Sequence, residues 1–269
     1  MSKGIQQQKK LKILLIGDNC IDEYFHGRVK RINPEAPVPL FDIEKLSTKP
    51  GMSANVKENL VNIGYEVTHL TNKEEIKKTR YIDSYHNCQI LRVDKEPVIK
   101  KINLDVLNKL KIEDFSAIIF SDYNKGYLDR DSIIYLFSYF ENYDIPVFVD
   151  SKKNDISCFS KCFLKINEHE YQKAINIHKD CKLIVTMGEK GAKYKDKIFP
   201  SNKLNINDVT KIGDRCGAGD TFLAGLIHQF IKTKDIESSI IFANICASFS
   251  VKKIGVYALT RSDIESIRI

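Results

Sequence analysis

Three glycines and two aspartates gather near the carboxyl terminus, in the twelve residues KIGDRCGAGDTF from Lys211 to Phe222. The chain has only 13 glycines, yet Gly213, Gly217 and Gly219 fall within seven residues. Glycine is costly to order, so such clustering indicates a backbone that approaches a ligand closely or adopts positive φ. The stretch therefore suggests a phosphate cradle, a plain loop-to-helix turn or a nucleophile turn.

The residues after the glycines favour a helix over 221–231, because their apolar side chains recur at helical spacing. Gly217, Ala218 and Gly219 then lie at the amino terminus of that helix, where unpaired N–H groups and the helix dipole attract anions. Small side chains also let a phosphate touch the backbone. We therefore predict that these three residues form an anion hole.

Asp220 follows in the first turn and faces the same anion site. A carboxylate beside a phosphate needs a reason, because like charges repel. A base that takes the proton of an attacking hydroxyl group as the phosphoryl group arrives supplies one. The alternative is an aspartate that merely caps the helix. The stretch lacks the Gly-Lys-Ser/Thr of a P-loop, does not follow the first strand as a dinucleotide loop does, and has no nucleophile-elbow serine.

Five short apolar runs, each ending in a polar or glycine-containing corner, are typical of buried parallel strands. They are LKILLIGD, SAIIFSDY, IPVFVDSK, CFLKIN and KLIVTMGEKG. Helices are predicted between several of them, at 55–63, 104–111, 131–142 and 168–175. The alternation predicts right-handed βαβ units and a mostly parallel sheet covered on both faces, an α/β fold.

Ligands of such sheets bind beyond the carboxyl ends of the strands. The polar residues that end the predicted strands should therefore line one rim: Asp18, Asp122, Asp150, Asn167 and Thr186.

Two segments, at about 24–50 and 79–96, interrupt this alternation of strands and helices. The first is rich in proline, and both contain alternating strand-like pieces. Because prolines confine strands to sheet edges, we predict a small antiparallel β-flap that projects from the main sheet as a lid.

The composition, with 43% hydrophobic and 29% charged residues among 269, is that of an ordinary globular protein and fits one large domain. The net charge of +7 comes from scattered lysines, without an arginine-rich or aromatic-interleaved basic segment, so no nucleic-acid partner is predicted. The seven cysteines form no C-x-x-C pair and are expected to be reduced. No apolar run reaches signal-peptide or membrane-spanning length, so we expect a cytoplasmic protein without a membrane partner.

The stretch DRCGAGDTF resembles the second signature of the ribokinase-like (PfkB-type) sugar kinases, usually written D-T-x-G-A-G-D. IGDNCIDEY, PGMSANVKENLVNIG, INEHE and VTMGEKG resemble, in order, the family's first-strand exit, G-G-x-x-x-N-x-A helix start, N-x-x-E element and strand before the nucleotide pocket. The resemblance implies a single kinase domain over 1–269. Its expected fold is a three-layer α/β/α sandwich with a mostly parallel sheet and the β-flap.

The resemblance also implies roles for the matching residues. Asp220 would be the catalytic base toward the sugar hydroxyl, beside the anion hole for the transferred phosphoryl group. The residues expected to bind sugar hydroxyls are Asp22, Gly51 and Asn55. The residues expected around the nucleotide are Asn167, Glu168, His169, Glu170, Thr186, Gly188, Gly191 and Asn244.

ATP is implied as the phosphoryl donor, with Mg²⁺ and a monovalent cation as further cofactors. Asn167 and Glu170 would hold Mg²⁺ through water, since an amide and a carboxylate suit a hydrated octahedral ion. Structural alternatives stand beside these roles: Asn55 caps its helix, Glu170 is a solvated helix residue, and Asp18 or Asp22 satisfies a turn.

Three stretches, RINPEAPVP, SDYNKG and VDSK, most resemble the members of this family that phosphorylate heptose 7-phosphate on the way to ADP-heptose. The first is the most specific, although a lid sequence shared by related kinases would look alike. We therefore predict ATP-dependent phosphorylation of the anomeric hydroxyl of D-glycero-D-manno-heptose 7-phosphate. The alternatives are a kinase for another sugar or sugar phosphate (ribose, fructose or tagatose 6-phosphate) and a catalytically silent sugar- or nucleotide-binding protein.

A substrate that already bears a phosphate requires a second basic site. Arg31, Arg80 and Arg92, on the predicted flap, are the candidates, and the alternative is that they are solvated charges on edge strands. The alternating apolar faces of the flap strands suggest a homodimer through the lid. No nucleotidyltransferase part follows the last predicted helix, so a separate protein is expected to perform nucleotidyl transfer.

The chain departs from the family pattern in three places. Met52 replaces the second glycine of the helix-start motif, which puts a bulky side chain where the backbone should approach the sugar. Arg215 replaces a threonine beside the anion hole and would add a phosphate contact. The segment between Gly64 and Lys78 is short, which predicts a narrower sheet on one side or a more mobile flap.

Overall fold

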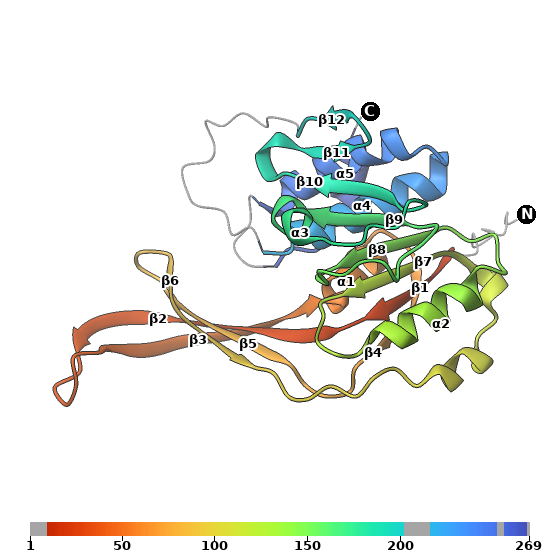
Figure 1. Cartoon of the computed structure of the whole chain (residues 1–269). Helices are drawn as coiled ribbons and strands as arrows, with labels where there is room; N and C mark the ends of the chain where they lie inside the picture. Colours follow the sequence, from red (N-terminus) through yellow and green to blue (C-terminus); the bar gives the residue numbers. More distant parts are fainter. Residues whose placement is uncertain (1–9, 202–215, 252–255, 268–269) are drawn as a thin grey trace, which may run out of the picture.

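The five apolar runs form the middle of an eight-stranded sheet with the order β12-β11-β10-β9-β8-β7-β1-β4 (Figure 1). The computed structural model describes residues 10–201, 216–251 and 256–267. The strands from β10 to β4 are parallel, and β11 and β12 add an antiparallel edge. The strand bounds are β1 (Lys12–Gly17), β4 (Glu66–Thr71), β7 (Phe115–Asp122), β8 (Val147–Ser151), β9 (Phe163–Asn167), β10 (Lys182–Thr186), β11 (Ala192–Tyr194) and β12 (Lys197–Phe199).

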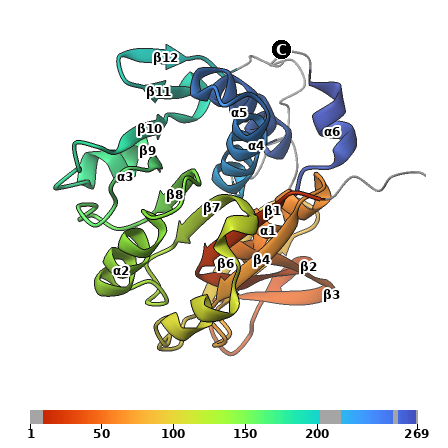
Figure 2. The same ribbon diagram turned by 90° about the vertical axis from the view of Figure 1, so that its right-hand side faces the viewer.

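Helices cover both faces of this sheet, which confirms the predicted three layers (Figure 2). Along β1, Ile13 and Leu15 pack against the layer that contains α1 and α4, whereas Leu14 and Ile16 pack against the layer that contains α2. Strands buried on both faces read as continuous apolar runs, which is why β1 was visible in the sequence. The helix bounds are α1 (Ser53–Asn62), α2 (Arg130–Phe140), α3 (Glu168–Lys173), α4 (Ala218–Thr233), α5 (Ile236–Ser250) and α6 (Arg261–Ser266).

A second, four-stranded sheet projects from the body and is called the flap (Figure 1). Its strands are β2 (Asn19–Ile32), β3 (Pro39–Met52), β5 (Lys77–Asp83) and β6 (Cys88–Lys95), in the order β3-β2-β5-β6. β2–β3 and β5–β6 are antiparallel hairpins, but β2 and β5 pair in parallel, so the prediction of a purely antiparallel flap was wrong. The reason is topological: β2 and β5 follow the parallel neighbours β1 and β4 and leave the body in the same direction.

The flap has two faces of different character. The face turned toward the body, called the inner face, carries two cross-strand rows: Lys49, Asp22, Lys78 and Asp94, then Ser47, Tyr24, Arg80 and Arg92. The opposite face, called the outer face, carries the row Leu46, Phe25, Tyr81 and Leu91, next to Val93. In these rows charge faces the body and apolar side chains face away from it, while Lys77 and Glu23 form an ion pair on the outer face near its root.

Two further predictions about elements needed correction or refinement. The predicted helix at 104–111 is a 3₁₀ segment, η1 (Leu104–Lys109), followed by a second short one, η2 (Ile112–Asp114). Each is too short for an α-helix with a packed face, since η1 buries only Leu107. Between Gly64 and Lys78 the chain forms the edge strand β4 and then enters β5 after five residues, without a helix between them.

The seven cysteines all lie in the described ranges and form no disulfide bond there. Cys162 and Cys181 lie at the starts of neighbouring strands with their sulfur atoms 3.7 Å apart. Within the described ranges, no helix is both long and apolar enough to span a membrane.

Candidate active site

Asp220 is buried in the first turn of α4, with 4% of its surface exposed, and both of its carboxylate oxygens accept hydrogen bonds from side chains. Asn55 Nδ2 donates to Oδ2 at 2.8 Å, and the Tyr123 hydroxyl donates to Oδ1 at 2.6 Å. Burial raises the pKa of Asp220, while the hydrogen bonds from Asn55 and Tyr123 oppose that rise. The result is a buried carboxylate held in a fixed orientation.

The alternative that Asp220 only caps its helix does not agree with these contacts. The N-cap of α4 is Gly217, which has no side chain to donate or accept, and the Asp220 carboxylate accepts from other elements. Asp235, at the start of α5, is a true cap, because its carboxylate accepts from the N–H groups of Glu237 and Ser238. Asn55 is likewise not a cap, since α1 begins at Ser53 without a side-chain cap.

The predicted anion hole lies directly beside this carboxylate. Gly217 has φ +81°, a left-handed conformation that favours glycine, and Ala218 begins the helix. At Gly219 a Cβ atom would lie 2.8 Å from the Nζ atom of Lys165, so a larger residue would displace that lysine. The first-turn N–H groups of α4 therefore lie beside small residues and a buried cation, as an anion site requires.

Tyr123 is a member of this site that the sequence interpretation missed. It follows β7, and its loop is held by Asp18, whose carboxylate accepts from the N–H groups of Tyr123, Lys125 and Tyr127. The alternative that Asp18 satisfies a turn is therefore correct, and that turn positions the Tyr123 hydroxyl. Burial, and then the neighbouring Asp220, raise the pKa of Tyr123 well above its usual value, so its hydroxyl stays a donor.

A chain of buried and half-buried charges runs from the anion hole toward α3. Lys165 Nζ donates to Asp150 Oδ2 at 2.7 Å, and both side chains are 2% exposed. Lys152 bridges Asp150 and Glu170, with its Nζ atom 3.5 Å from Asp150 Oδ1. Burial alone would raise the pKa of Asp150, but Lys152 and Lys165 outweigh it and hold that pKa below its usual value. The signal for Lys165 was a charged residue inside the apolar run CFLKIN.

Asn167 and Glu170 are joined in a capping box at the start of α3. Asn167 Oδ1 accepts from the N–H of Glu170 at 2.8 Å, and Glu170 Oε2 accepts from the N–H of Asn167 at 2.7 Å. Glu170 is therefore not a freely solvated helix residue. Glu168 and His169 are exposed in the same turn, and Glu168 lies 3.9 Å from Lys190.

The other residues predicted around the nucleotide surround the ends of β10 and β11. Thr186 ends β10, and its hydroxyl donates to the carbonyl of Ile166. Gly188 has φ +58° with open space around it, whereas Gly191 packs tightly against the backbone of Phe199. Asn244, on α5, donates its amide to the carbonyl of Phe199 at 2.9 Å. The glycine at 191 thus has a structural reason of its own.

On the opposite side of Asp220, Asp22 and Gly51 face each other across the β2–β3 hairpin. A Cβ atom at Gly51 would clash with Asp22 Oδ2, so glycine is required there. Asp22 Oδ1 forms a buried ion pair with Arg80, whose Nη2 also donates to Cys216 Sγ at 3.4 Å. These contacts connect the root of the flap to the residue that precedes the anion hole.

Met52 does not obstruct this side of the site, contrary to the expectation from its bulk. Its side chain is 3% exposed and packs in the core cluster that contains Leu14 and Ile16. Its backbone keeps a left-handed φ of +55°, which favours glycine and costs a non-glycine residue roughly 1–3 kcal/mol. The backbone therefore keeps a glycine-like path, and the methionine side chain points into the core.

Of the three arginines predicted to bind a substrate phosphate, the structure brings together two, Arg80 and Arg92. Arg80 belongs to the site, but Arg31 is exposed at the end of β2 remote from the body. Arg92 lies beside Arg80 on the inner face and forms two 2.7 Å hydrogen bonds with Asp94. Arg215 lies outside the described residues.

The donor set fits a hydrated Mg²⁺ held through water. Asp150, Asn167 and Glu170 offer the oxygen ligands that this ion takes. Asp150 Oδ1 is buried, yet no hydrogen bond reaches it from the described residues. Nowhere in the described ranges do three or more His, Cys, Asp or Glu side chains form a group that could hold a metal directly.

Comparisons with known proteins agree with this arrangement. The pfkB family of carbohydrate kinases matches residues 140–263. The bifunctional protein HldE of Sulfurimonas denitrificans is 34% identical over 310 residues, which cover 94% of this chain and 63% of that protein. HldE of a Nitratiruptor species is 31% identical over 95% of this chain and 64% of its own length. The chain thus spans slightly less than two thirds of the curated relatives that it matches.

Solved structures share the fold over nearly the whole chain. Phosphofructokinase-2 of Escherichia coli, crystallised with potassium, superposes with a TM-score of 0.70 at 14% identity, covering 96% of this chain and 97% of the other. Ribokinase of Thermotoga maritima gives a TM-score of 0.68 at 16% identity, covering 95% and 98%. The chain is therefore similar to the pfkB family of carbohydrate kinases over residues 140–263, which include the signature at 214–220, and it has a ribokinase-like fold.

Proposed function

We propose that the chain transfers the γ-phosphoryl group of ATP to the anomeric hydroxyl of D-glycero-D-manno-heptose 7-phosphate and yields the 1,7-bisphosphate. The observation that carries the proposal is the buried Asp220 carboxylate, oriented by Asn55 and Tyr123 beside the first turn of α4. The similarity to proteins named HldE and the stretches RINPEAPVP, SDYNKG and VDSK favour heptose 7-phosphate over other sugars.

In the proposed reaction, Asp220 accepts the proton of the sugar hydroxyl while the oxygen of that hydroxyl bonds to the γ-phosphorus. The bond from that phosphorus to the bridging oxygen breaks, and ADP leaves with the electron pair. Asp220 suits this task because each of its oxygens already accepts one hydrogen bond, which fixes the carboxylate and leaves lone pairs for the substrate.

Negative charge on the transferred group would be received by the N–H groups of 217–219, with Lys165 behind Gly219. Lys152 lies between this point and α3 and would face the nucleotide phosphates. Mg²⁺, held through water by Asn167 and Glu170, would neutralise phosphate charge. The potassium in the related phosphofructokinase-2 crystal favours a monovalent cation as a further cofactor.

The test measures ATP turnover over a panel of heptose 7-phosphate, heptose, fructose, ribose and tagatose 6-phosphate. We expect heptose 7-phosphate to give the highest kcat/KM. Asp220→Asn should lower kcat by about 10²–10⁴-fold, because it removes a positioned base. Asp235→Asn is the matched control: Asp235 starts the next helix but only caps it, and asparagine caps equally well.

Turnover confined to unphosphorylated sugars would contradict the heptose 7-phosphate assignment and leave a kinase for another sugar. ATP binding without turnover of any sugar would favour the silent binding protein. Equal losses in Asp220→Asn and Asp235→Asn would remove Asp220 from the chemistry.

We also propose that two copies pair through the outer face of the flap. Leu46, Leu91 and Val93 are 52%, 53% and 47% exposed there, next to the stacked rings of Phe25 and Tyr81. An apolar sheet face of this kind is typical of a protein–protein contact. A second copy is the simplest occupant, because both copies present the same face.

A further inference from the structure

The cations on the inner face of the flap differ in whether they have a partner. Lys49 Nζ donates to the carbonyl of Val256 at 2.6 Å. Arg80 is paired with Asp22, and Arg92 with Asp94. Lys78, between Asp22 and Asp94 in the same cross-strand row, has no carboxylate within 4 Å among the described residues.

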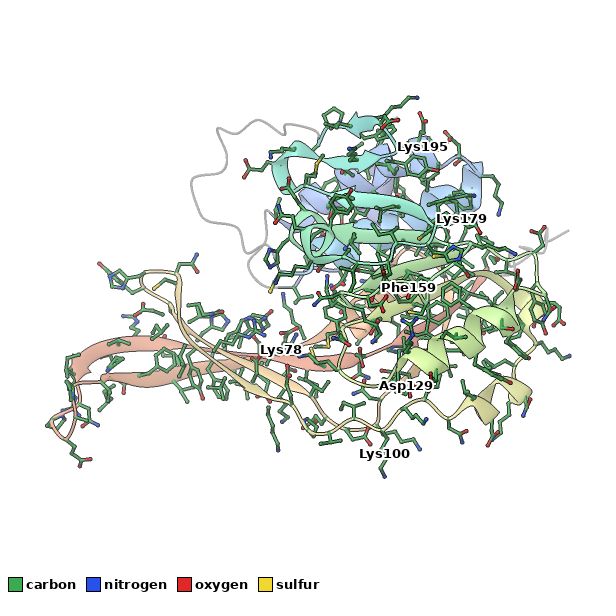
Figure 3. The ribbon with its side chains drawn as sticks, viewed as in Figure 1. Lys78, Lys100, Asp129, Phe159, Lys179 and Lys195 are labelled. Carbon is green, nitrogen blue, oxygen red and sulfur yellow. The ribbon has the colours of Figure 1, made fainter. Side chains whose placement is uncertain are left out.

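Lys78 is also close to the proposed base. Its Nζ atom lies 5.7 Å from the centre of the Tyr123 ring, and the hydroxyl of that ring donates to Asp220. Figure 3 labels Lys78 where the flap meets the body. The side chain is half-buried, because the body covers this part of the inner face. A partly desolvated ammonium group beside a single aromatic ring gains strongly from an anionic ligand.

Lys152 lies at a similar distance from the same ring but has the opposite status. Its Nζ atom is 5.5 Å from the Tyr123 centre, and it is held by Asp150 and Glu170. Lys152 therefore belongs to the charge network on the nucleotide side, and its charge is already balanced. Lys78, on the flap side, has no carboxylate partner among the described residues, so its charge is available to an anionic ligand.

We propose that Lys78 binds the phosphate that the sugar substrate already carries and so makes this kinase specific for phosphorylated sugars. The inference rests on the proposed function and deepens it. The reacting hydroxyl and the phosphate lie at opposite ends of the sugar, and Tyr123 contacts Asp220 through its hydroxyl while Lys78 lies near its ring. Arg80 and Arg92 neutralise Asp22 and Asp94, so that these carboxylates do not repel the incoming phosphate.

The test compares Lys78→Met with Lys77→Met by steady-state kinetics. Lys77 is the matched control, because it points to the outer face and pairs with Glu23 and Glu75. For Lys78→Met we expect the KM for heptose 7-phosphate to rise roughly 10–100-fold, the range of one hydrogen bond to a charged group, with the KM for ATP unchanged. Lys78→Arg should recover most of the affinity, and Lys77→Met should behave as the native protein.

Two outcomes would overturn the inference while leaving the kinase proposal intact. In one, the native protein phosphorylates heptose 7-phosphate and Lys78→Met does so with the same KM. In the other, Lys78→Met loses activity equally on heptose 7-phosphate and on unphosphorylated heptose, so that the lysine acts through Tyr123. A native protein that uses no phosphorylated sugar overturns both proposals, and the panel separates that case from the first two.

Discussion

The body and the flap differ in how they use charged and apolar residues. In the body, charged side chains are buried and joined to one another, as in the chain from Lys165 through Asp150 and Lys152 to Glu170. In the flap, every residue of β6 is exposed, and the outer face presents apolar side chains to solvent. The charged side chains of this network are paired with one another, whereas the apolar side chains of the outer face are open to solvent.

This difference indicates which region determines specificity for the sugar and for a partner. A paired network holds its charged groups in fixed positions, so it suits the phosphoryl-transfer steps that are common to all reactions of the site. The flap offers Lys78 on one face and an apolar row on the other, and both gain by contact with a further molecule. We therefore assign the chemistry to the body, and the choice of sugar and of partner to the flap.

The sharpest test of the body's half of this comparison is Lys165→Met. The change leaves Asp150 buried beside only Lys152, so we expect the free energy of unfolding to fall by roughly 3–5 kcal/mol, as when one partner of a buried pair is removed. Urea-induced equilibrium unfolding measures it. The double variant Asp150→Asn with Lys165→Met should recover part of the loss, since no unpaired charge remains.

Lys161→Met serves as the control, because Lys161 pairs with Glu141 at an exposed position. It should leave the free energy of unfolding unchanged. If Lys165→Met were no more destabilising than Lys161→Met, the buried network would have no structural role.

The proposed dimer contact of the flap is tested by placing lysines on its outer face. Leu91→Lys with Val93→Lys should convert a dimer into a monomer in sedimentation velocity, because two lysines would oppose their copies across the contact. Losing a central apolar contact of at least ~2 kcal/mol corresponds to a dissociation constant raised about 30-fold or more. Ile198→Lys is the control, since Ile198 is 61% exposed on β12, far from the flap. A native protein that is monomeric at all concentrations would contradict the dimer.

The smallest expected effect concerns the junction of the two regions. Tyr123→Phe removes the hydroxyl that donates to Asp220 and stabilises its charged form, so the pKa of Asp220 should rise further. A base must be deprotonated, so activity is lost as pH falls through that pKa, and a higher pKa moves the loss to higher pH. We expect kcat/KM to fall roughly 10-fold at acid pH and little at alkaline pH.

The measurement is the pH profile of kcat/KM, with Tyr127→Phe as its control. Tyr127 lies four residues further along the same loop, where only its backbone N–H bonds to Asp18. If the acid limb of the pH profile is the same in Tyr123→Phe as in the native protein, the Tyr123 hydroxyl does not lower the pKa of Asp220.

Much of the body could be predicted because its information is local. β1 and β7 are uninterrupted apolar runs, and the glycines before α4 mark a helix start whatever surrounds it. β4 and β11 escaped prediction, since an edge strand such as EVTHLT and a three-residue strand carry little pattern. The 3₁₀ segment at Leu104–Lys109 was mistaken for a helix because its composition is helical but only Leu107 is buried.

The site was predictable only where a short motif carried it. Asp220, Asn55 and Gly217 follow from the signature and the helix start, and the structure brings them into contact. Tyr123 and Lys78 owe their places to contacts across 97 and 45 positions of the chain, which no local pattern records. The parallel pairing of β2 with β5 is invisible for the same reason.

Two of the four flap strands, β2 and β3, join the body without a loop. Asp18 is the only residue between β1 and β2, β3 runs into α1 at Met52, and the N–H of Ser53 donates to the carbonyl of Asp18 at 3.0 Å. A lid joined to the body by loops can rotate as a rigid unit, whereas strands that continue directly into the body move by elastic bending along their length. Met52, where β3 meets α1, lies three residues before Asn55, whose side chain donates to the proposed base Asp220. The backbone of β3 thus continues into the helix whose Asn55 side chain donates a hydrogen bond to the Asp220 carboxylate.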